Sequence, residues 1–245
     1  MNANILLNPY KIYFYSILTI LIIASCNSND YIIGNERTTS IERELPPFQK
    51  LDIQGNYEVM LLKSPNSSLI IETDENLIHL IRTEVENDTL KIYNKDKIKS
   101  KSNIKIYISY QKVNEINVGG ASSIKSEMPL QTENLKLTMN GTGFMEFELE
   151  AETLELNLSG TGMINLSGKV EKEALHLSGA GNFNAYNLKS KECYIVLSGI
   201  GSAHIYVENN LNAQISGVGG IKYKGNPTSV NREIAGIGTI NKVND

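Results

Sequence analysis

The stretch from Leu158 to Leu166 reads LSGTGMINL, and nineteen residues later the chain nearly repeats it as LSGAGNFNA, from Leu177 to Ala185. This Gly-X-Gly motif recurs through the second half of the sequence. Its first glycines are Gly141, Gly160, Gly179, Gly199, Gly217 and Gly236, at spacings of 19, 19, 20, 18 and 19 residues. Its second glycines are Gly143, Gly162, Gly181, Gly201, Gly219 and Gly238. Such a regular period indicates an internal structural repeat.

Each repeat specifies an inward and an outward face. The residue four positions after the first glycine is apolar in every copy: Met145, Ile164, Phe183, Ala203, Ile221 and Ile240. The residue after it is polar in every copy: Glu146, Asn165, Asn184, His204, Lys222 and Asn241. Apolar residues also stand two positions before the first glycine: Met139, Leu158, Leu177, Leu197, Ile215 and Ile234. This alternation is typical of strands with one buried face.

The repeat is too short for packed helices, because helical repeats need more than about thirty residues. Nineteen residues suffice for one rung of a β-solenoid, with rungs stacked ~4.8 Å apart. The sequence therefore predicts an all-β protein, a single-stranded β-helix over residues 113–245, with the glycines at tight corners that leave little room for a Cβ atom. Residues 45–112 alternate with a period of two and predict further strands, apart from a weak helical period near Leu77 to Val85.

The N-terminus has the features of an export signal. Lys11 precedes an apolar run from Ile12 to Ala24 that is too short to span a bilayer comfortably. Ala24 and Ser25 stand directly before Cys26, which resembles a bacterial lipobox. We therefore expect a lipoprotein signal peptide over residues 1–25, acylation of Cys26 as the attachment to the membrane, and a polar tether over residues 26–44. An ordinary signal peptide followed by a chance cysteine is the alternative.

The sequence offers little for catalysis or nucleic-acid binding. The net charge of −4 is not offset by any run of Lys and Arg, which disfavours nucleic acid. The Gly-X-Gly copies lack the third glycine of a dinucleotide fingerprint and the aspartate of a calcium-binding repeat. His176 and His204 fall on outward positions, and Cys193 and Glu173 share an inward column. We predict no catalytic residue, cofactor or metal site.

Several longer stretches resemble a known family. FQKLDIQGNYEVMLL, TLKIY, the serial LSGxG copies and YKGNPTSVNREIAGIGTI are similar to the head-GIN domain, a family named for auto-transporter adhesins and found mainly in lipoproteins of Bacteroidetes. The resemblance covers roughly residues 45–243 and implies a right-handed β-helix in the cell envelope. An autotransporter ends in a membrane β-barrel, whereas this sequence ends at Asp245, just past the last repeat, so attachment is expected through Cys26.

These observations lead to one expected function and two alternatives. We expect a lipid-anchored, adhesin-like envelope protein, on the outer membrane, that binds a glycan or protein ligand through its repetitive surface. A carbohydrate-active β-helix enzyme is the first alternative, and a structural or stress-related envelope protein without an external ligand is the second. The sequence does not identify the ligand, the side of the membrane or the oligomeric state.

Overall fold

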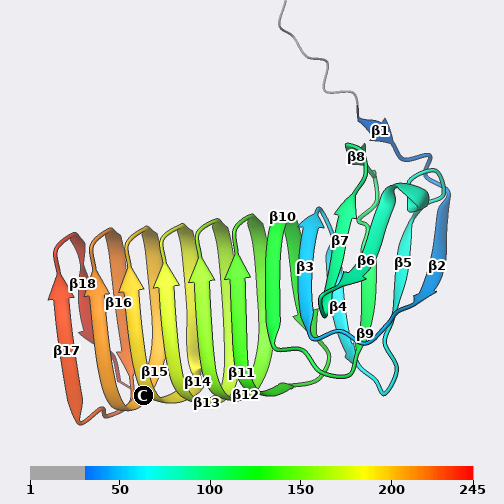
Figure 1. Cartoon of the computed structure of the whole chain (residues 1–245). Coiled ribbons are helices and arrows are strands. Elements are labelled where there is room, and N and C mark those ends of the chain that lie inside the picture. The colour runs from blue at the N-terminus through cyan, green and yellow to red at the C-terminus, as the bar shows by residue number, and fades with distance from the viewer. Residues whose placement is uncertain (1–30, 245) are drawn as a thin grey trace, which may run out of the picture. The chain divides into compact units, whose positions relative to one another are not determined.

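A stack of parallel strands forms the C-terminal half of the chain (Figure 1). The computed structural model describes residues 31–244, so the predicted signal peptide and Cys26 lie outside the described residues. The strands of the stack are β10 (Glu115–Ser126), β11 (Leu130–Met139), β12 (Thr142–Leu158), β13 (Thr161–Leu177), β14 (Ala180–Leu197), β15 (Ile200–Ile215), β16 (Val218–Lys224), β17 (Ser229–Ile234) and β18 (Ile237–Lys242).

The pairing of these strands confirms the predicted solenoid and its faces, except at Ile234, which is 47% exposed because no later rung covers it. Met145 lies opposite Ile164, Ile164 opposite Phe183, and Phe183 opposite Ala203, so equivalent residues of successive repeats stack on one another. The whole inward column from Met145 to Ile240 is buried. The fold class is therefore an all-β solenoid whose rungs are about nineteen residues apart, with its core running along the axis of the stack.

The Gly-X-Gly motifs are corners where one rung rests directly on the backbone of the rung before it. A Cβ atom on Gly160 would lie 1.8 Å from the carbonyl oxygen of Gly141, and one on Gly179 would lie 1.9 Å from that of Gly160. The column of first glycines continues into the N-terminal part of the chain, through Gly120, which rests on Gly55. Close approach of main chains is thus the reason for the glycines.

The N-terminal strands extend the stack before they close it. β3 (Lys50–Gly55) and β4 (Glu58–Lys63) pair in parallel with β10 and form a rung of their own. β7 (Thr89–Asn94) and β9 (Lys105–Tyr110) pair in parallel with β3 and β4 and form the next rung outward. The predicted division at residue 112 therefore does not separate two kinds of structure, because residues on both sides of it build rungs.

Antiparallel strands cover the outer rung. β6 (Ile81–Glu86) pairs with β7, β5 (Ser68–Asp74) pairs with β9, and β2 (Thr38–Glu44) pairs with β5. β1 (Ile32–Ile33) pairs in parallel with β8 (Ile98–Lys99) in a separate two-stranded sheet. This antiparallel cover protects the first edge of the stack from pairing with another chain.

Two expectations for this region need correction. Residues 38–44, expected to belong to a polar tether, form β2, because Ile41 packs against the core while the polar residues beside it face solvent. The weak helical period near Leu77 to Val85 corresponds to one short 3₁₀ turn, η1 (Ile78–Leu80), followed by strand β6. The described residues contain no α-helix.

The far end of the stack is open. All six residues of β17 are exposed, and Ile237 at the start of β18 is 74% exposed. Arg232 stacks below Ala213, in the inward column that Leu156, Leu175 and Ile195 occupy in earlier rungs. Its guanidinium lies 5.2 Å from the centre of the Tyr223 ring and donates a hydrogen bond to the Tyr223 hydroxyl. A charged side chain thus ends an apolar column.

Candidate binding surfaces

Each rung presents two outward surfaces. We call the outward side chains of the segment before a Gly-X-Gly corner the leading face, and those of the segment after it the trailing face. On β13, for example, Ala174 and His176 belong to the leading face, and Asn165 and Ser167 belong to the trailing face. Because rungs stack in register, equivalent side chains form parallel columns along the solenoid.

The leading face carries a groove of about 790 Å³ that crosses the rungs of β12 to β17. The groove forms at Ala174, whose small side chain stands between Glu155 and Tyr194 in its column. Its volume lies within the usual range for small-molecule sites, roughly 300–1,000 Å³. Its polar and aromatic lining comes from Thr153, Glu155, Lys172, His176, Glu192, Tyr194, Asn210, Asn212, Ser229 and Asn231.

Two rings and one amide define the middle of the groove. The His176 and Tyr194 rings meet edge to face, with centroids 5.9 Å apart. Tyr194 is 38% exposed, which is high for a large aromatic side chain. In the next rung, the Asn212 Oδ1 atom is buried and accepts no hydrogen bond from the described residues. A buried acceptor without a donor is costly, and turning the Asn212 amide toward the groove would let Oδ1 accept a hydrogen bond from a ligand hydroxyl.

Charged side chains surround this centre in pairs. Lys136 Nζ lies 3.3 Å from Glu155 Oε1, and Lys172 Nζ lies 3.2 Å from Glu192 Oε2. A hydrogen bond donated by Asn157, together with Lys136, lowers the pKa of Glu155. Glu155 is therefore an anion at neutral pH. It can accept hydrogen bonds from a ligand but is poorly suited to donate a proton.

An unusual inward pair lies beneath the groove. Glu173 and Cys193 are opposite one another inside the solenoid and are both buried. Ser190 donates a 2.9 Å hydrogen bond to Glu173 Oε1, but burial dominates and raises the pKa of Glu173 to about 7. Burial and the neighbouring Glu173 also raise the pKa of the Cys193 thiol, which disfavours a reactive thiolate. We interpret this pair as part of the core.

The trailing face carries a ladder of amides beside an aromatic pair. Asn184 Nδ2 donates a 3.0 Å hydrogen bond to Asn165 Oδ1, and His204 Nδ1 lies 3.0 Å from Asn184 Oδ1. The Tyr186 and His204 rings stack with centroids 4.8 Å apart, and Lys224 Nζ lies 5.3 Å from the centre of the Tyr186 ring. Partial burial and Lys222 lower the pKa of His204. Because these side chains form hydrogen bonds and ring contacts with one another, the ladder offers a ligand fewer unpaired donors and acceptors than the groove does.

The structure places the predicted surface residues with one difference. His176 is exposed as expected, whereas His204 is partly buried under its stack with Tyr186. Residues 31–244 contain no group of three or more His, Cys, Asp or Glu side chains that could hold a metal ion. In the same range, no helix is long and apolar enough to cross a bilayer.

Two features were missed in the sequence. The groove is visible there only as Ala174 among longer residues of its column. The expected absence of a run of Lys and Arg is wrong, since Lys95, Lys97, Lys99 and Lys101 lie within seven residues.

The protein is thus a β-solenoid with a packed apolar interior and a groove on its exterior. The chain belongs to the family described as "Putative auto-transporter adhesin, head GIN domain", whose family model matches residues 47–227. A comparison with curated proteins found no match.

Several solved structures share the fold. A protein from Bacteroides fragilis described as a "putative adhesin" is 27% identical, with a TM-score of 0.80, over 86% of this chain and all of that one. A protein from Parabacteroides distasonis described as a "putative lipid binding protein" is 25% identical, with a TM-score of 0.70, over 87% of this chain and all of that one. A "putative adhesin" from Parabacteroides merdae is 22% identical, with a TM-score of 0.69, over 87% of this chain and 99% of that one, and shows the fold alone.

Proposed function

We propose that this protein is an adhesin-like binding protein of the cell envelope, held at the membrane by an acylated Cys26, and that the leading-face groove binds a glycan. The observation that carries the proposal is the combination at the groove centre of the Tyr194 and His176 rings with the unpaired Asn212 Oδ1 atom. The family name and the names of the solved relatives support a binding role at the cell surface.

The chemistry of the groove matches a sugar better than a protein segment. A sugar ring offers an apolar C–H face for an aromatic ring and hydroxyls that both donate and accept hydrogen bonds. Tyr194 can contact the apolar face, and Asn212 and the anionic Glu155 can accept from the hydroxyls. Asparagines on neighbouring rungs, Asn210 and Asn231, add donors and acceptors along the groove. Repeated weak contacts of this kind gain strength when many copies are displayed on one membrane.

Three other functions are less well supported. An enzyme acting on polysaccharides needs a carboxylic acid that donates a proton, and Glu155 is instead held as an anion by Lys136 and Asn157. A site for lipid, suggested by the name of the P. distasonis relative, would need an apolar cavity, whereas buried side chains fill the solenoid interior. A role as a structural envelope protein without an external ligand would leave the groove unused.

Binding of the purified domain, residues 27–245, to an array of bacterial and host glycans tests the proposal. We expect Tyr194→Ala to weaken binding by about 5- to 150-fold, because removing an aromatic contact and its packing costs roughly 1–3 kcal/mol. Tyr186→Ala is the matched control, since it removes a partly buried tyrosine of the same strand from the trailing face. Equal loss in both variants, or cleavage of the glycan by the domain, would contradict the proposal.

The anchor is tested separately. Metabolic labelling with an alkyne fatty acid should mark the full-length protein and not Cys26→Ala, because the thiol of that residue would carry the lipid. The variant should keep the melting temperature of the parent, since residues from Ile32 onward form one folded unit. Equal labelling of the two proteins would show that Cys26 is not the acylated residue.

A further inference from the structure

The lysine-rich segment from Lys95 to Lys101 stands out from the charge of the rest of the protein. It contains four lysines and one aspartate, a net charge of +3, whereas the whole chain carries −4, so the remaining residues carry −7. All four lysines are exposed. Ile98 lies in the middle of the segment and packs against the core, so the lysines on either side of it project into solvent.

This segment is tied directly to the start of the folded chain. β8 pairs with β1, placing Ile32 opposite Ile98 and Ile33 opposite Lys99. The Ile32 amide donates a 2.8 Å hydrogen bond to the Lys97 carbonyl, and the Gly34 amide donates a 3.0 Å bond to the Lys99 carbonyl. Ile32 and Ile33 are 40% and 49% exposed, so two apolar side chains accompany the lysines.

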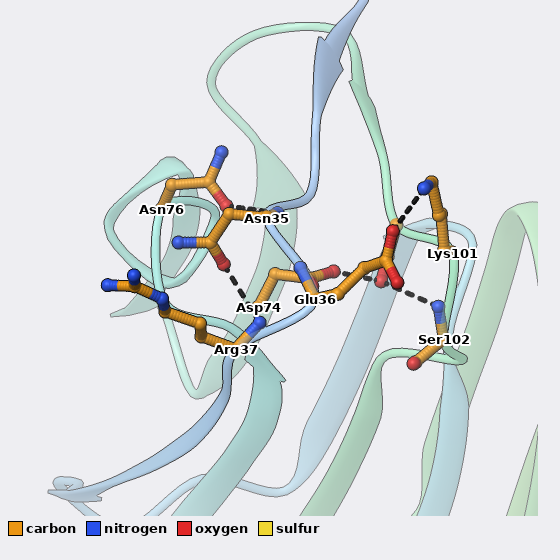
Figure 2. A network of polar contacts seen from close by, with 8 residues as sticks. Asn35, Glu36, Arg37, Asp74, Asn76, Lys101 and Ser102 are labelled. Atoms are coloured by element: carbon orange, nitrogen blue, oxygen red, sulfur yellow. Dashed lines mark hydrogen bonds and ion pairs between the residues drawn. The ribbon is translucent and has the colours of Figure 1, made fainter.

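A polar network holds this arrangement in place, as Figure 2 shows. The Glu36 amide donates a 2.6 Å hydrogen bond to Asp74 Oδ1, and the Asn35 amide donates a 2.9 Å bond to Asn76 Oδ1. Asn76 Nδ2 donates a 2.8 Å bond back to the Ile33 carbonyl, and Lys101 forms an ion pair with Glu36. Gly34 fits closely against Asp74, because a Cβ atom there would lie 2.1 Å from Asp74 Oδ2. Residues 33–37 are thus fixed to the head of the solenoid.

The distance to the anchor is short. Six residue steps separate Cys26 from Ile32, and a fully extended chain gains at most ~3.5 Å per step, so β1 lies within about 20 Å of an acylated Cys26. The exposed lysines and isoleucines beside β1 must then lie close to the lipid headgroups. This step rests on the acylation put forward under Proposed function.

We propose that β1, β8 and the lysines of residues 95–101 form a docking surface for the anionic headgroups of the membrane that holds the anchor. The exposed ammonium groups of Lys95 and Lys99 attract headgroup phosphates, and Ile32 and Ile33 contact the interface. The acidic groups near the surface are the buried Asp74, which Ser100 and the Glu36 amide contact, and Asp96, Glu36 and Glu75, of which the last two pair with Lys101 and Arg37. Because the remaining residues carry −7, an anionic membrane attracts this surface and repels the rest, which leaves the solenoid standing away from the lipid.

Vesicle binding by residues 27–245, which lack Cys26, tests the docking surface without any acyl chain. Binding to vesicles of phosphatidylglycerol and phosphatidylethanolamine is expected, with weak or no binding to phosphatidylcholine and a steep loss as salt is added. A lysine near an anionic surface contributes about fivefold in affinity, so Lys95→Gln with Lys99→Gln should weaken binding about 25-fold. The matched control is Lys112→Gln with Lys222→Gln, which removes the same charge from exposed positions elsewhere.

The docking surface and the acylation of Cys26 can fail independently of one another. Equal weakening by the two double variants, or equal binding to phosphatidylcholine, would overturn the docking surface even if Cys26 is acylated. Equally tight binding to soluble dextran sulfate would show a general polyanion site and would also overturn it. Failure of fatty-acid labelling with intact vesicle binding would overturn only the acylation. Unchanged melting temperatures confirm that both double variants are folded.

Discussion

Replacing one corner glycine by alanine tests whether main-chain contact between rungs holds the solenoid together. In Gly179→Ala, the new Cβ atom would lie 1.9 Å from the Gly160 carbonyl oxygen, whereas real Cβ atoms essentially never approach within 3.0 Å. The two rungs must therefore separate by about 1 Å at this corner. The two inter-rung hydrogen bonds most affected run from the Gly179 amide to the Leu158 carbonyl and from the Ala180 amide to the Gly160 carbonyl, and both are 2.9 Å long.

The expected cost follows from these two bonds. Each contributes about 1 kcal/mol net, and an amide left without a partner costs up to ~3 kcal/mol, so Gly179→Ala should destabilise the domain by roughly 2–4 kcal/mol. Urea unfolding measures this directly, and the melting temperature should fall by about 5–12 °C for a domain of this size.

Gly220→Ala is the matched control. Its Cβ atom would meet nothing closer than 3.7 Å, and its stability should change by less than ~0.5 kcal/mol. Equal losses for the two variants would refute the explanation of the corner glycines.

Three further predictions concern the core and the open end. Leu177→Asp should destabilise the domain by about 3–5 kcal/mol in urea unfolding, because it places a charge between Leu158 and Leu197. Asn184→Asp, which loses only the hydrogen bond to Asn165, should cost no more than about 1 kcal/mol. The pKa of Glu173 is raised from 4.5 to about 7, so the stability that its proton provides is complete below pH 4.5 and is lost as the pH rises to 7. The free energy of unfolding of Glu173→Gln, measured in urea, should therefore rise relative to that of the parent by about 3 kcal/mol between pH 4.5 and pH 8. A difference that stays constant with pH would contradict the burial of the carboxyl group. Arg232→Val should self-associate through the open end in light scattering, because Val230, Ile234 and Ile237 are already exposed there. A monodisperse variant at all concentrations would show that Arg232 does not protect this edge.

The regular part of the fold could be predicted because each repeat has the same spacing of glycine, apolar and polar residues. An apolar residue follows every first glycine at the same distance, and the pairing of Met145 with Ile164 and of Ile164 with Phe183 is the one that this spacing requires. Cys193 was placed inward by the same alignment, and it is buried.

The N-terminal rungs could not be recognised by spacing. The rung of β3 and β4 has its corner at Gly55, and Tyr57 stands where later rungs have their second glycine or a serine, so the motif is absent. Strand β2 was missed because its sequence, TTSIERE, contains one large apolar residue, Ile41.

The groove was harder to predict for a different reason. The groove exists because the Ala174 side chain is shorter than those of Glu155 and Tyr194 on the two adjacent rungs. This difference in side-chain length matters only once the three rungs are aligned in space. The unpaired acceptor of Asn212 is likewise a property of the folded surface.

The order of the first rungs has a consequence for how the chain folds. The rung of β3 and β4 lies between the rung of β7 and β9 and the strand β10, and both neighbours follow it in the sequence. It therefore acts as a template with two growing edges. One edge is closed by the outer rung and its antiparallel cover, and each later rung then adds to the other edge. Growth in one direction predicts a gradient of amide hydrogen exchange, slowest near β3 and fastest at β17 and β18.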